Sequence, residues 1–238
     1  SISICLSGKA FISLICDKNS INGHYIEPYA GGAAVALHLL IEDYVAKITI
    51  NDLNRSIFAF WYSVINHTSS LCNLINKTEI NLENLTKQKQ IQKAKENISL
   101  LKLGFSTLFL NRTNISGILD AGVIGGKAQN GKYKINCRFN KKKIINRIKT
   151  IASYKNKINV YNLDAIKLIK KITKESLDSN TIFYFDPPYF LKGQSLYMNY
   201  YENKDHKYVS QQIKKIKNAK WIVSYDNVKQ VKKLYKEY

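Results

Sequence analysis

The segment TIFYFDPPYF, residues 181–190, places one carboxylate, two prolines and two aromatic rings next to one another. The β-branched and aromatic residues before Asp186 predict a strand that ends at this acid. The prolines restrict the backbone that follows, so the Asp186 carboxylate and the Pro187 carbonyl would be held in place as acceptors for N–H groups of a substrate. The ring of Tyr189 could stack on an aromatic base. A Pro-Pro turn that only closes a strand would explain the prolines, but neither Asp186 nor Tyr189.

Three other predicted strand ends carry groups suited to binding a nucleoside. EPYAGG (27–32) follows the first strand, and its glycines would let the backbone approach a ligand closely at the start of a helix. Asp52 ends the second strand, 20 residues beyond Gly32. At this separation an acid commonly accepts hydrogen bonds from ribose hydroxyls. Asp164 follows the third strand. The plainer interpretations are a tight turn for the glycines and helix N-caps for the acids.

Two common nucleotide-binding patterns are absent from the sequence. Neither the dinucleotide pattern G-x-G-x-x-G nor the phosphate-binding pattern G-x-x-x-x-G-K-[ST] occurs. Their absence argues against a nicotinamide cofactor and leaves nucleotide hydrolysis without support. The favoured ligand is therefore a nucleoside that is bound mainly through its ribose.

The elements expected to position these groups alternate between strand and helix. We expect a short helix over 10–16, a strand, turn and helix over 24–43, a strand over 46–54, helices over 55–110, a strand and helix over 157–172, a strand and loop over 181–190, a helix over 205–218, a strand over 220–226 and a closing helix over 227–238. Such alternation is typical of a parallel sheet, whose ligands lie beyond the carboxyl ends of the strands. We therefore expect one α/β domain, formed by residues 1–54 and 158–238. An inserted domain of residues 55–157 interrupts it and is mostly helical, with a β-hairpin at its Asn-Gly pair.

The chain carries a large excess of positive charge, with 37 basic against 17 acidic residues and a formal net charge of +20. A genome rich in A and T could also raise the lysine content. However, the 43 residues from Ala121 to Leu163 contain no acid. This distribution favours a nucleic-acid-binding face over a merely solvated one. Four scattered cysteines indicate neither a zinc site nor a disulfide framework, and no segment approaches the roughly 20 apolar residues that span a bilayer. We expect a cytoplasmic protein without a metal.

Four segments that occur in this order, EPYAGG, NDLN, NRTNISG and FYFDPPYF, resemble the adenine-N6-specific DNA methyltransferases of the Dam-like (alpha) class. The resemblance covers nearly the whole chain. It implies an α/β, Rossmann-like, S-adenosylmethionine-dependent methyltransferase fold with an inserted target-recognition domain. It also implies S-adenosyl-L-methionine as the cofactor and a flipped-out adenine of double-stranded DNA as the substrate. We expect the protein to be the modification enzyme of a restriction system, with a cognate endonuclease acting on the same site.

The resemblance assigns residues to the cofactor and to catalysis. The implied cofactor-binding residues are Lys9, Tyr29, Ala30, Gly31, Gly32, Asp52, Asp164 and Asp186, and the implied catalytic residues are Asp186, Pro187, Pro188 and Tyr189. The lone pair of the adenine amine is delocalised into the ring. Acceptors at Asp186 and Pro187 would draw this nitrogen toward tetrahedral geometry and expose the lone pair. Base flipping costs a few kcal/mol, which stacking on Tyr189, worth about 1–3 kcal/mol, would largely offset.

The inserted domain supplies the implied DNA-binding residues. They are Asn111, Arg112, Asn114, Lys127, Gln129, Asn130, Lys132, Tyr133 and Arg138, although some of the lysines will only be solvated. The GATC-specific branch of the class continues differently from ISGILDAGVIGG, so GATC specificity is not implied. The family usually carries a hairpin after its last helix, where this sequence ends in KKLYKEY.

Two alternatives stay open. An RNA or protein-glutamine methyltransferase could use the same sheet, although the glutamine enzymes usually have Asn in place of Asp186 and the RNA enzymes usually lack a long basic insertion. A DNA-binding protein whose catalytic domain has decayed would explain why CLSGK (5–9) departs from the family pattern. It would not explain the intact DPPY, the glycine turn and Asp52.

Overall fold

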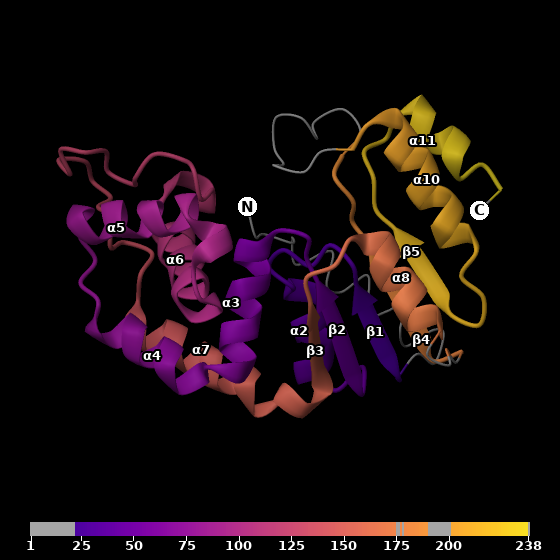
Figure 1. Ribbon diagram of the computed structural model, residues 1–238, viewed down its shortest axis with the longest axis horizontal. Coiled ribbons are helices and arrows are strands. Elements are labelled where there is room, and N and C mark those ends of the chain that lie inside the picture. The colour runs from indigo at the N-terminus through magenta and orange to yellow at the C-terminus, as the bar shows by residue number, and fades with distance from the viewer. Residues whose placement is uncertain (1–21, 175–176, 178, 190–200, 238) are drawn as a thin grey trace. The chain divides into compact units, whose positions relative to one another are not determined.

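The computed structural model describes residues 22–174, 177, 179–189 and 201–237 (Figure 1). The helix expected over 10–16 and the candidate Lys9 lie outside the described residues. The chain divides into two compact units. The helical unit contains Arg55–Val160, and the described part of the α/β unit lies within residues 22–54 and 161–237.

Five strands form one sheet in the order β3-β2-β1-β4-β5. The strands are β1 (His24–Glu27), β2 (Lys47–Asn51), β3 (Ile158–Tyr161), β4 (Thr181–Phe185) and β5 (Lys220–Val223). The pairings of β1 with β2, of β1 with β4 and of β4 with β5 are parallel. This arrangement confirms the α/β class that the alternation of strand and helix predicts. The chain runs outward from the central strand β1 through β2 to β3 and then crosses to β4 on the other side of β1. Ligands of such sheets bind at the carboxyl ends of the strands where the strand order reverses in this way.

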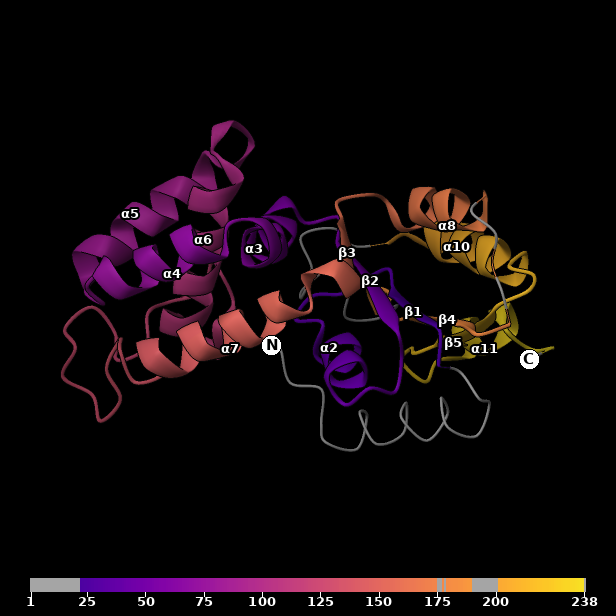
Figure 2. The same cartoon turned by 90° about the horizontal axis from the view of Figure 1, so that it is seen from below.

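Helices cover both faces of this sheet. The α/β unit contains α2 (Ala34–Ile41), α8 (Ala165–Lys174), α10 (Asn203–Lys214) and α11 (Lys229–Leu234). Figure 2 shows α8 and α10 on one face and α2 on the opposite face. The apolar stripe of α8, which includes Ile169 and Ile172, packs with Ile213 of α10 over the buried rings of Phe183 and Phe185 in β4. These two rings stack with centroids 5.7 Å apart and anchor the strand that precedes Asp186.

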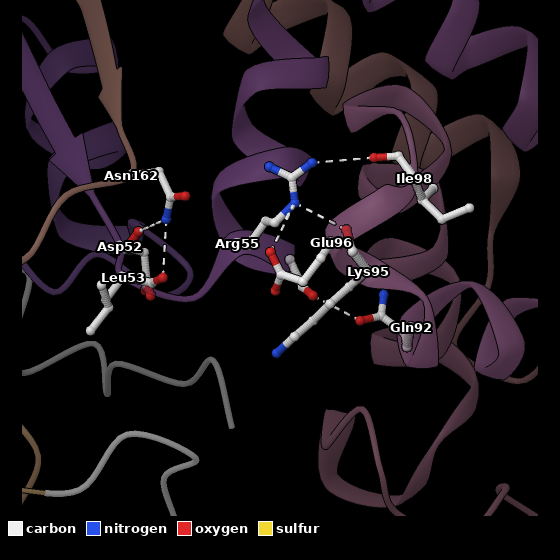
Figure 3. A network of polar contacts seen from close by, with 9 residues as sticks. Asp52, Leu53, Arg55, Gln92, Lys95, Glu96, Ile98 and Asn162 are labelled. Atoms are coloured by element: carbon white, nitrogen blue, oxygen red, sulfur yellow. Dashed lines mark hydrogen bonds and ion pairs between the residues drawn. The ribbon is translucent and has the colours of Figure 1, made fainter.

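The helical unit is built around one long, mostly buried helix, α6 (Leu100–Thr113). The other helices of this unit are α3 (Arg55–Asn66), α4 (Thr68–Lys77), α5 (Leu82–Lys93) and α7 (Lys141–Ser153), with short 3-10 turns η1 (Lys95–Asn97), η2 (Ile115–Gly117) and η3 (Lys155–Lys157). Figure 3 shows how Arg55, at the start of α3, holds the segment before α6. Its Nε donates to the carbonyl of Lys95 at 3.0 Å and its Nη2 to that of Ile98 at 3.3 Å.

Gly104 lets α6 approach α3 closely. A Cβ atom at this position would overlap the Ala59 carbonyl oxygen and would lie 2.7 Å from Ser63 Oγ. We therefore expect Gly104→Ala to lower the free energy of unfolding by about 1–3 kcal/mol, as overpacked cores do. Urea unfolding followed by circular dichroism measures this. Gly122→Ala is the matched control, because its Cβ would meet only Ile115 Cδ1 at 3.7 Å. Equal stability of the two variants would contradict this account of the α3–α6 contact.

The prediction of a β-hairpin at the Asn-Gly pair is wrong. Among the described residues 111–139, the only β pairing is an isolated antiparallel bridge between Asn114 and Val123, and the rest forms turns. The Gln129 side chain supplies hydrogen bonds that a partner strand would otherwise make. Its amide nitrogen donates to the carbonyls of Ile124 and Gly126, and its amide oxygen accepts from the Ile135 N–H at 2.8 Å. A side chain that bonds to nearby backbone competes in this way with a strand ladder.

Candidate active site

Three carboxyl groups gather at the carboxyl edge of the sheet. Glu27 ends β1, Asp52 directly follows β2, and Asp186 directly follows β4. Because these strands are adjacent and parallel, their carboxyl ends meet at one edge. The pKa of Glu27 is raised to about 8, chiefly by burial; the backbone of Ala36 lowers it and the negative charges of Asp186 and Asp52 contribute to the rise. The sequence singled out Asp52 and Asp186, and the structure adds Glu27.

The glycine turn after β1 is tied to Asp52. Gly31 adopts a φ of 47°, in the left-handed region that favours glycine, and its N–H donates to Asp52 Oδ2 at 3.0 Å. Asp52 Oδ1 accepts from the Asn54 N–H at 2.8 Å, and the Ala30 N–H donates to the Asn51 carbonyl at 2.8 Å. Burial raises the pKa of Asp52, while the two N–H donors lower it. The turn and the predicted ribose-binding acid therefore form one hydrogen-bonded assembly.

Two asparagines that the sequence did not single out hold neighbouring loops together. The buried Asn51 side chain donates to the carbonyls of Pro28 and Leu163, both at 2.9 Å, and accepts from the Leu163 N–H at 2.9 Å. Asn162 Nδ2 donates to the carbonyls of Asp52 at 2.8 Å and Leu53 at 3.0 Å (Figure 3). Besides the place of Asn51 in the NDLN segment, the available signal was its amide at the end of an apolar strand. A buried amide there must find partners, and these lie in the loops on either side.

Asp164 caps a helix. Its Oδ1 accepts from the N–H groups of Ile166 at 2.9 Å and Lys167 at 3.3 Å, in the first turn of α8. This is the plainer of the two roles that the sequence offered for an acid at a strand end. A contact with a cofactor stays a prediction for this residue.

The DPPY segment begins at the end of β4. The β4–β5 ladder continues to its last residue, where the Ser224 N–H donates to the Phe185 carbonyl at 2.8 Å. Pro187 and Pro188 are buried. Asp186 Oδ1 is also buried, and none of the described residues supplies it with a hydrogen-bond partner. Burial raises the pKa of Asp186 to about 6, and the charge of Asp186 in turn raises the pKa of the half-buried Tyr189. The segment thus presents an unsatisfied acceptor beside an aromatic ring.

A cluster of aromatic side chains connects the glycine turn with α10. The Tyr29 hydroxyl lies 2.9 Å from that of Tyr201, and the two rings meet edge to face. The Tyr201 ring contacts His206, whose Nδ1 lies 2.8 Å from the Tyr225 hydroxyl. Burial raises the pKa of Tyr29 well above its ordinary value and lowers that of His206. Tyr201 lies 172 residues from Tyr29 in the sequence, so no local pattern could have paired them.

In the helical unit, two of the DNA-binding candidates shape the loop after α6. Asn111 Nδ2 donates to the Gly117 carbonyl at 3.0 Å. Asn114 is fully buried, and its Nδ2 donates to the carbonyls of Ile118 and Leu119. The Arg138 guanidinium reaches from outside the loop to the carbonyls of Asn111 and Asn114, at 2.8 Å each. These amides therefore satisfy loop backbone groups within the chain.

Arg112 lies in a cluster of guanidinium groups. Its Nε is buried and has no hydrogen-bond partner within the part of the chain that the structure describes. Burial lowers the pKa of Arg112, and the positive charges of Arg138 and Arg147 lower it further. Because arginine stays charged in proteins, such a cluster is suited to an anion.

The remaining DNA-binding candidates lie mostly on the surface. Lys127, Asn130, Lys132 and Tyr133 are exposed, while Gln129 is partly buried by its contacts within the loop. The Tyr133 side chain is 63% exposed, an unusual state for so large a ring, and Lys132 Nζ lies 5.8 Å from the ring centroid. An exposed ring beside a cation is the pairing by which proteins stack bases near phosphates.

The described residues form neither a candidate metal site nor a helix that could span a membrane. No group of three or more His, Cys, Asp or Glu side chains that could hold a metal ion occurs among them. None of the helices that they form has the length and apolar character needed to cross a bilayer.

Comparison with known proteins identifies the family. The family described as D12 class N6 adenine-specific DNA methyltransferase matches residues 9–238. The chain belongs to this family. Among curated proteins, it is similar to the Type II methyltransferase M.MjaIII of Methanocaldococcus jannaschii, with 25% identity over 176 residues. The similar region covers 69% of this chain and 58% of that relative, so the chain spans less than two thirds of the relative's length. The comparison confirms the resemblance to adenine-N6 DNA methyltransferases.

A D12 class methyltransferase needs a methyl donor. At the carboxyl edge of the sheet, two buried hydrogen-bond acceptors lack partners among the described residues and could bind a ligand. Glu27 Oε2 and Asp186 Oδ1 are buried acceptors that no described residue satisfies. Among the described residues, none has an atom within 4 Å of the position that a Cβ at Gly31 would take. Buried polar groups are normally satisfied, so unsatisfied ones at this edge fit a ligand with hydrogen-bond donors.

Proposed function

We propose that the protein transfers a methyl group from S-adenosylmethionine to N6 of an adenine in double-stranded DNA. The observation that carries this proposal is the Asp186 carboxyl group. It follows β4 at the carboxyl edge of the sheet, and its buried Oδ1 finds no partner among the described residues. An acceptor kept dry and unpaired is ready for a donor on the substrate. The family description, which names adenine N6 in DNA, favours this substrate over RNA or protein glutamine.

The cofactor would lie along the glycine turn. Asp52 would accept from the ribose hydroxyls, since each carboxylate oxygen keeps a lone pair beyond the one used by Gly31 or Asn54. Tyr29, Ala30 and Gly32 would line the same turn, Asp164 would approach the adenine ring, and Lys9 would complete the set. When bound, S-adenosylmethionine supplies an electrophilic methyl group.

Catalysis would rest on two acceptors and a ring. The Asp186 carboxylate and the Pro187 carbonyl would each accept from one N–H of the adenine amine, which frees the nitrogen lone pair. Pro188 would fix the turn so that both acceptors are in place before the substrate arrives. Tyr189 would stack on the base after it leaves the duplex. As a carboxylate, Asp186 can also take the proton that the nitrogen loses.

The helical unit would recognise the target sequence. It carries most of the acid-free segment of Ala121–Leu163, the guanidinium cluster around Arg112 and the exposed Tyr133. We propose that it binds a site other than GATC, because the loop after α6 departs from that branch. A cognate restriction endonuclease acting on the same site would be the partner.

The guanidinium cluster gives a prediction for DNA affinity. We expect Arg112→Gln to weaken DNA binding about equally for all sequences, because a phosphate contact carries no sequence information. The slope of log affinity against log salt concentration should become shallower by about 0.9. Fluorescence anisotropy of labelled duplexes at several salt concentrations measures both effects. Lys87→Gln is the control, since it removes one exposed charge that already pairs with Glu83 in the same unit. A salt slope unchanged by Arg112→Gln would rule out the phosphate contact.

Transfer of a labelled methyl group tests the proposed function. The protein is incubated with S-adenosylmethionine labelled in its methyl group and, separately, with duplex DNA, structured RNA and a glutamine-containing protein. We expect label in DNA alone, recovered as N6-methyladenine after digestion to nucleosides. Label in RNA or protein but not in DNA would contradict the proposal.

A further inference from the structure

The loop after α6, residues 114–123, carries two exposed apolar side chains beside the guanidinium cluster. Ile115 and Ile118 are 54% and 50% exposed. Arg112 lies in the last turn of α6, directly before the loop, and the charge of Arg138 acts on it. Phosphate contacts of such arginines fix the register of a protein on a duplex, while side chains that enter a groove read the base edges. The shape of this loop would therefore decide which side chains reach the bases.

The backbone of this loop adopts a conformation that needs fixed partners. Ser116 and Gly117 have φ angles of 54° and 73°, in the left-handed region that is uncommon for residues other than glycine. A Cβ at Gly117 would lie 2.9 Å from Asn111 Nδ2, the atom that donates to the Gly117 carbonyl at 3.0 Å. Such a conformation persists only where the surrounding contacts over-determine it.

Arg138 supplies one of these contacts from outside the loop. Its Nη2 donates to the carbonyls of Asn111 and Asn114 at 2.8 Å each. Both carbonyls lie at the C-terminal end of α6, where the last carbonyls lack helical partners and a cation is favoured. The Ile115 N–H would reach the Asn111 carbonyl in a continued helix, but it donates to the Gly122 carbonyl at 2.9 Å. Arg138 thus takes the place of the helical donor.

A second contact comes from α5. Lys89 Nζ donates to the Ala121 carbonyl at 3.1 Å, across 32 residues of the chain. Arg138 and Lys89 therefore hold the beginning and the end of the loop from two separate segments.

We propose that Arg138 is a positioning residue for target recognition, which sets the shape of the loop after α6 and does not itself read a base. The inference rests on the proposed function, which gives target recognition to the helical unit. Nη2 carries two hydrogens, and both are used on carbonyls of the protein. This nitrogen is then not available to a base edge. Lys89 acts in the same way at the end of the loop.

Two measurements on Arg138→Lys test the proposal. Lysine keeps the charge, but its Nζ takes the place of the arginine Cζ, one covalent bond short of the position that reaches both carbonyls. Amide hydrogen exchange of residues 115–122, measured without DNA, should become about tenfold faster or more, because hydrogen bonds from a charged donor are lost. Sequencing of N6-methyladenine in unmodified plasmid DNA incubated with the variant and S-adenosylmethionine gives the second readout. The preference for the wild-type context over single-base changes should fall about tenfold, within the roughly 5–150-fold effect of one mismatched base pair.

Lys89→Met tests the contact from α5 with the same two readouts. It should speed the exchange of the loop and relax the same sequence context as Arg138→Lys. Lys93→Met is the matched control, because it removes an exposed lysine from the same helix and should change neither readout. Thermal unfolding followed by circular dichroism checks that each variant folds, and Lys89→Met carries the test should Arg138→Lys fail to do so.

The outcomes distinguish this inference from the proposed function. A relaxed context without faster exchange in Arg138→Lys would mean that Arg138 contacts the bases directly, and would overturn the inference. Faster exchange with an unchanged context would also overturn it, because the loop would then have only a structural role. The proposed function stands in both cases. If the wild-type protein methylates no adenine in DNA, the proposed function falls and this inference falls with it.

Discussion

Asp186→Asn is expected to lower the rate constant of methyl transfer by about 10²–10⁴-fold, the range for loss of a positioned acid or base. The substituted amide keeps the shape of the side chain but removes its negative charge and its capacity to take a proton. Binding of S-adenosylhomocysteine and of DNA should remain close to that of the wild-type protein. Single-turnover transfer of a labelled methyl group to a duplex measures the rate constant. Asp43→Asn, an exposed position in the same unit with a φ that Asn tolerates, is the matched control.

The pH dependence of Asp186 gives an independent readout. Burial raises the pKa of this carboxyl group to about 6. Because the carboxylate is the proposed active form, kcat/KM should be flat above this pH and fall about tenfold per pH unit below it. The Asp186→Asn variant should lack this acidic limb. Near-normal turnover by the variant, or an identical pH profile, would refute the role of the carboxylate.

Asp52→Ala is expected to weaken the binding of S-adenosylhomocysteine by about 10–100-fold. Hydrogen bonds to a charged group contribute about 1.5–3 kcal/mol, and each 1.4 kcal/mol is a factor of ten in affinity. The change also removes the acceptor for the N–H groups of Gly31 and Asn54, so the glycine turn loses its tie to β2. Calorimetric titration measures the affinity. DNA binding by the helical unit should be unchanged.

A ligand analogue separates the ribose contact from the effect on the turn. The wild-type protein should prefer S-adenosylhomocysteine over its 2′,3′-dideoxy analogue, and Asp52→Ala should lose this preference. Asp120→Ala removes an exposed carboxylate from the helical unit and serves as the control. If Asp52→Ala weakens both ligands equally and keeps the preference, Asp52 supports the turn without contacting the ribose.

The sequence predicted the elements of the α/β unit because each of them has a strong local pattern. The strand, glycine turn and helix over 24–43 occur as β1, the turn at Gly31 and α2, and the apolar run before Asp186 occurs as β4. The strand order depends on contacts between distant segments, so periodicity could predict parallel strands but not that β1 lies between β2 and β4. The hairpin prediction failed because the Gln129 side chain satisfies the backbone that a partner strand would have paired.

Some residues of the candidate site could likewise be predicted from the sequence, and others could not. Asp52 and Asp186 stand out in the sequence because a single acid follows each apolar strand. Asn51 and Tyr201 act through partners more than 100 residues away in the chain, which no local pattern reveals. Glu27 was part of the EPYAGG segment but looked like an ordinary residue beside the glycines. Only its burial and its unsatisfied oxygen distinguish it.

Sequencing of modified bases at single-base resolution tests the central claim most directly. Unmodified DNA is incubated with S-adenosylmethionine and either the wild-type protein or Asp186→Asn, and every modified position is read with its sequence context. The account predicts N6-methyladenine at one recurring sequence other than GATC with the wild-type protein, and unmodified DNA with the variant. Methylation of cytosine, or equal adenine methylation by both proteins, would contradict it.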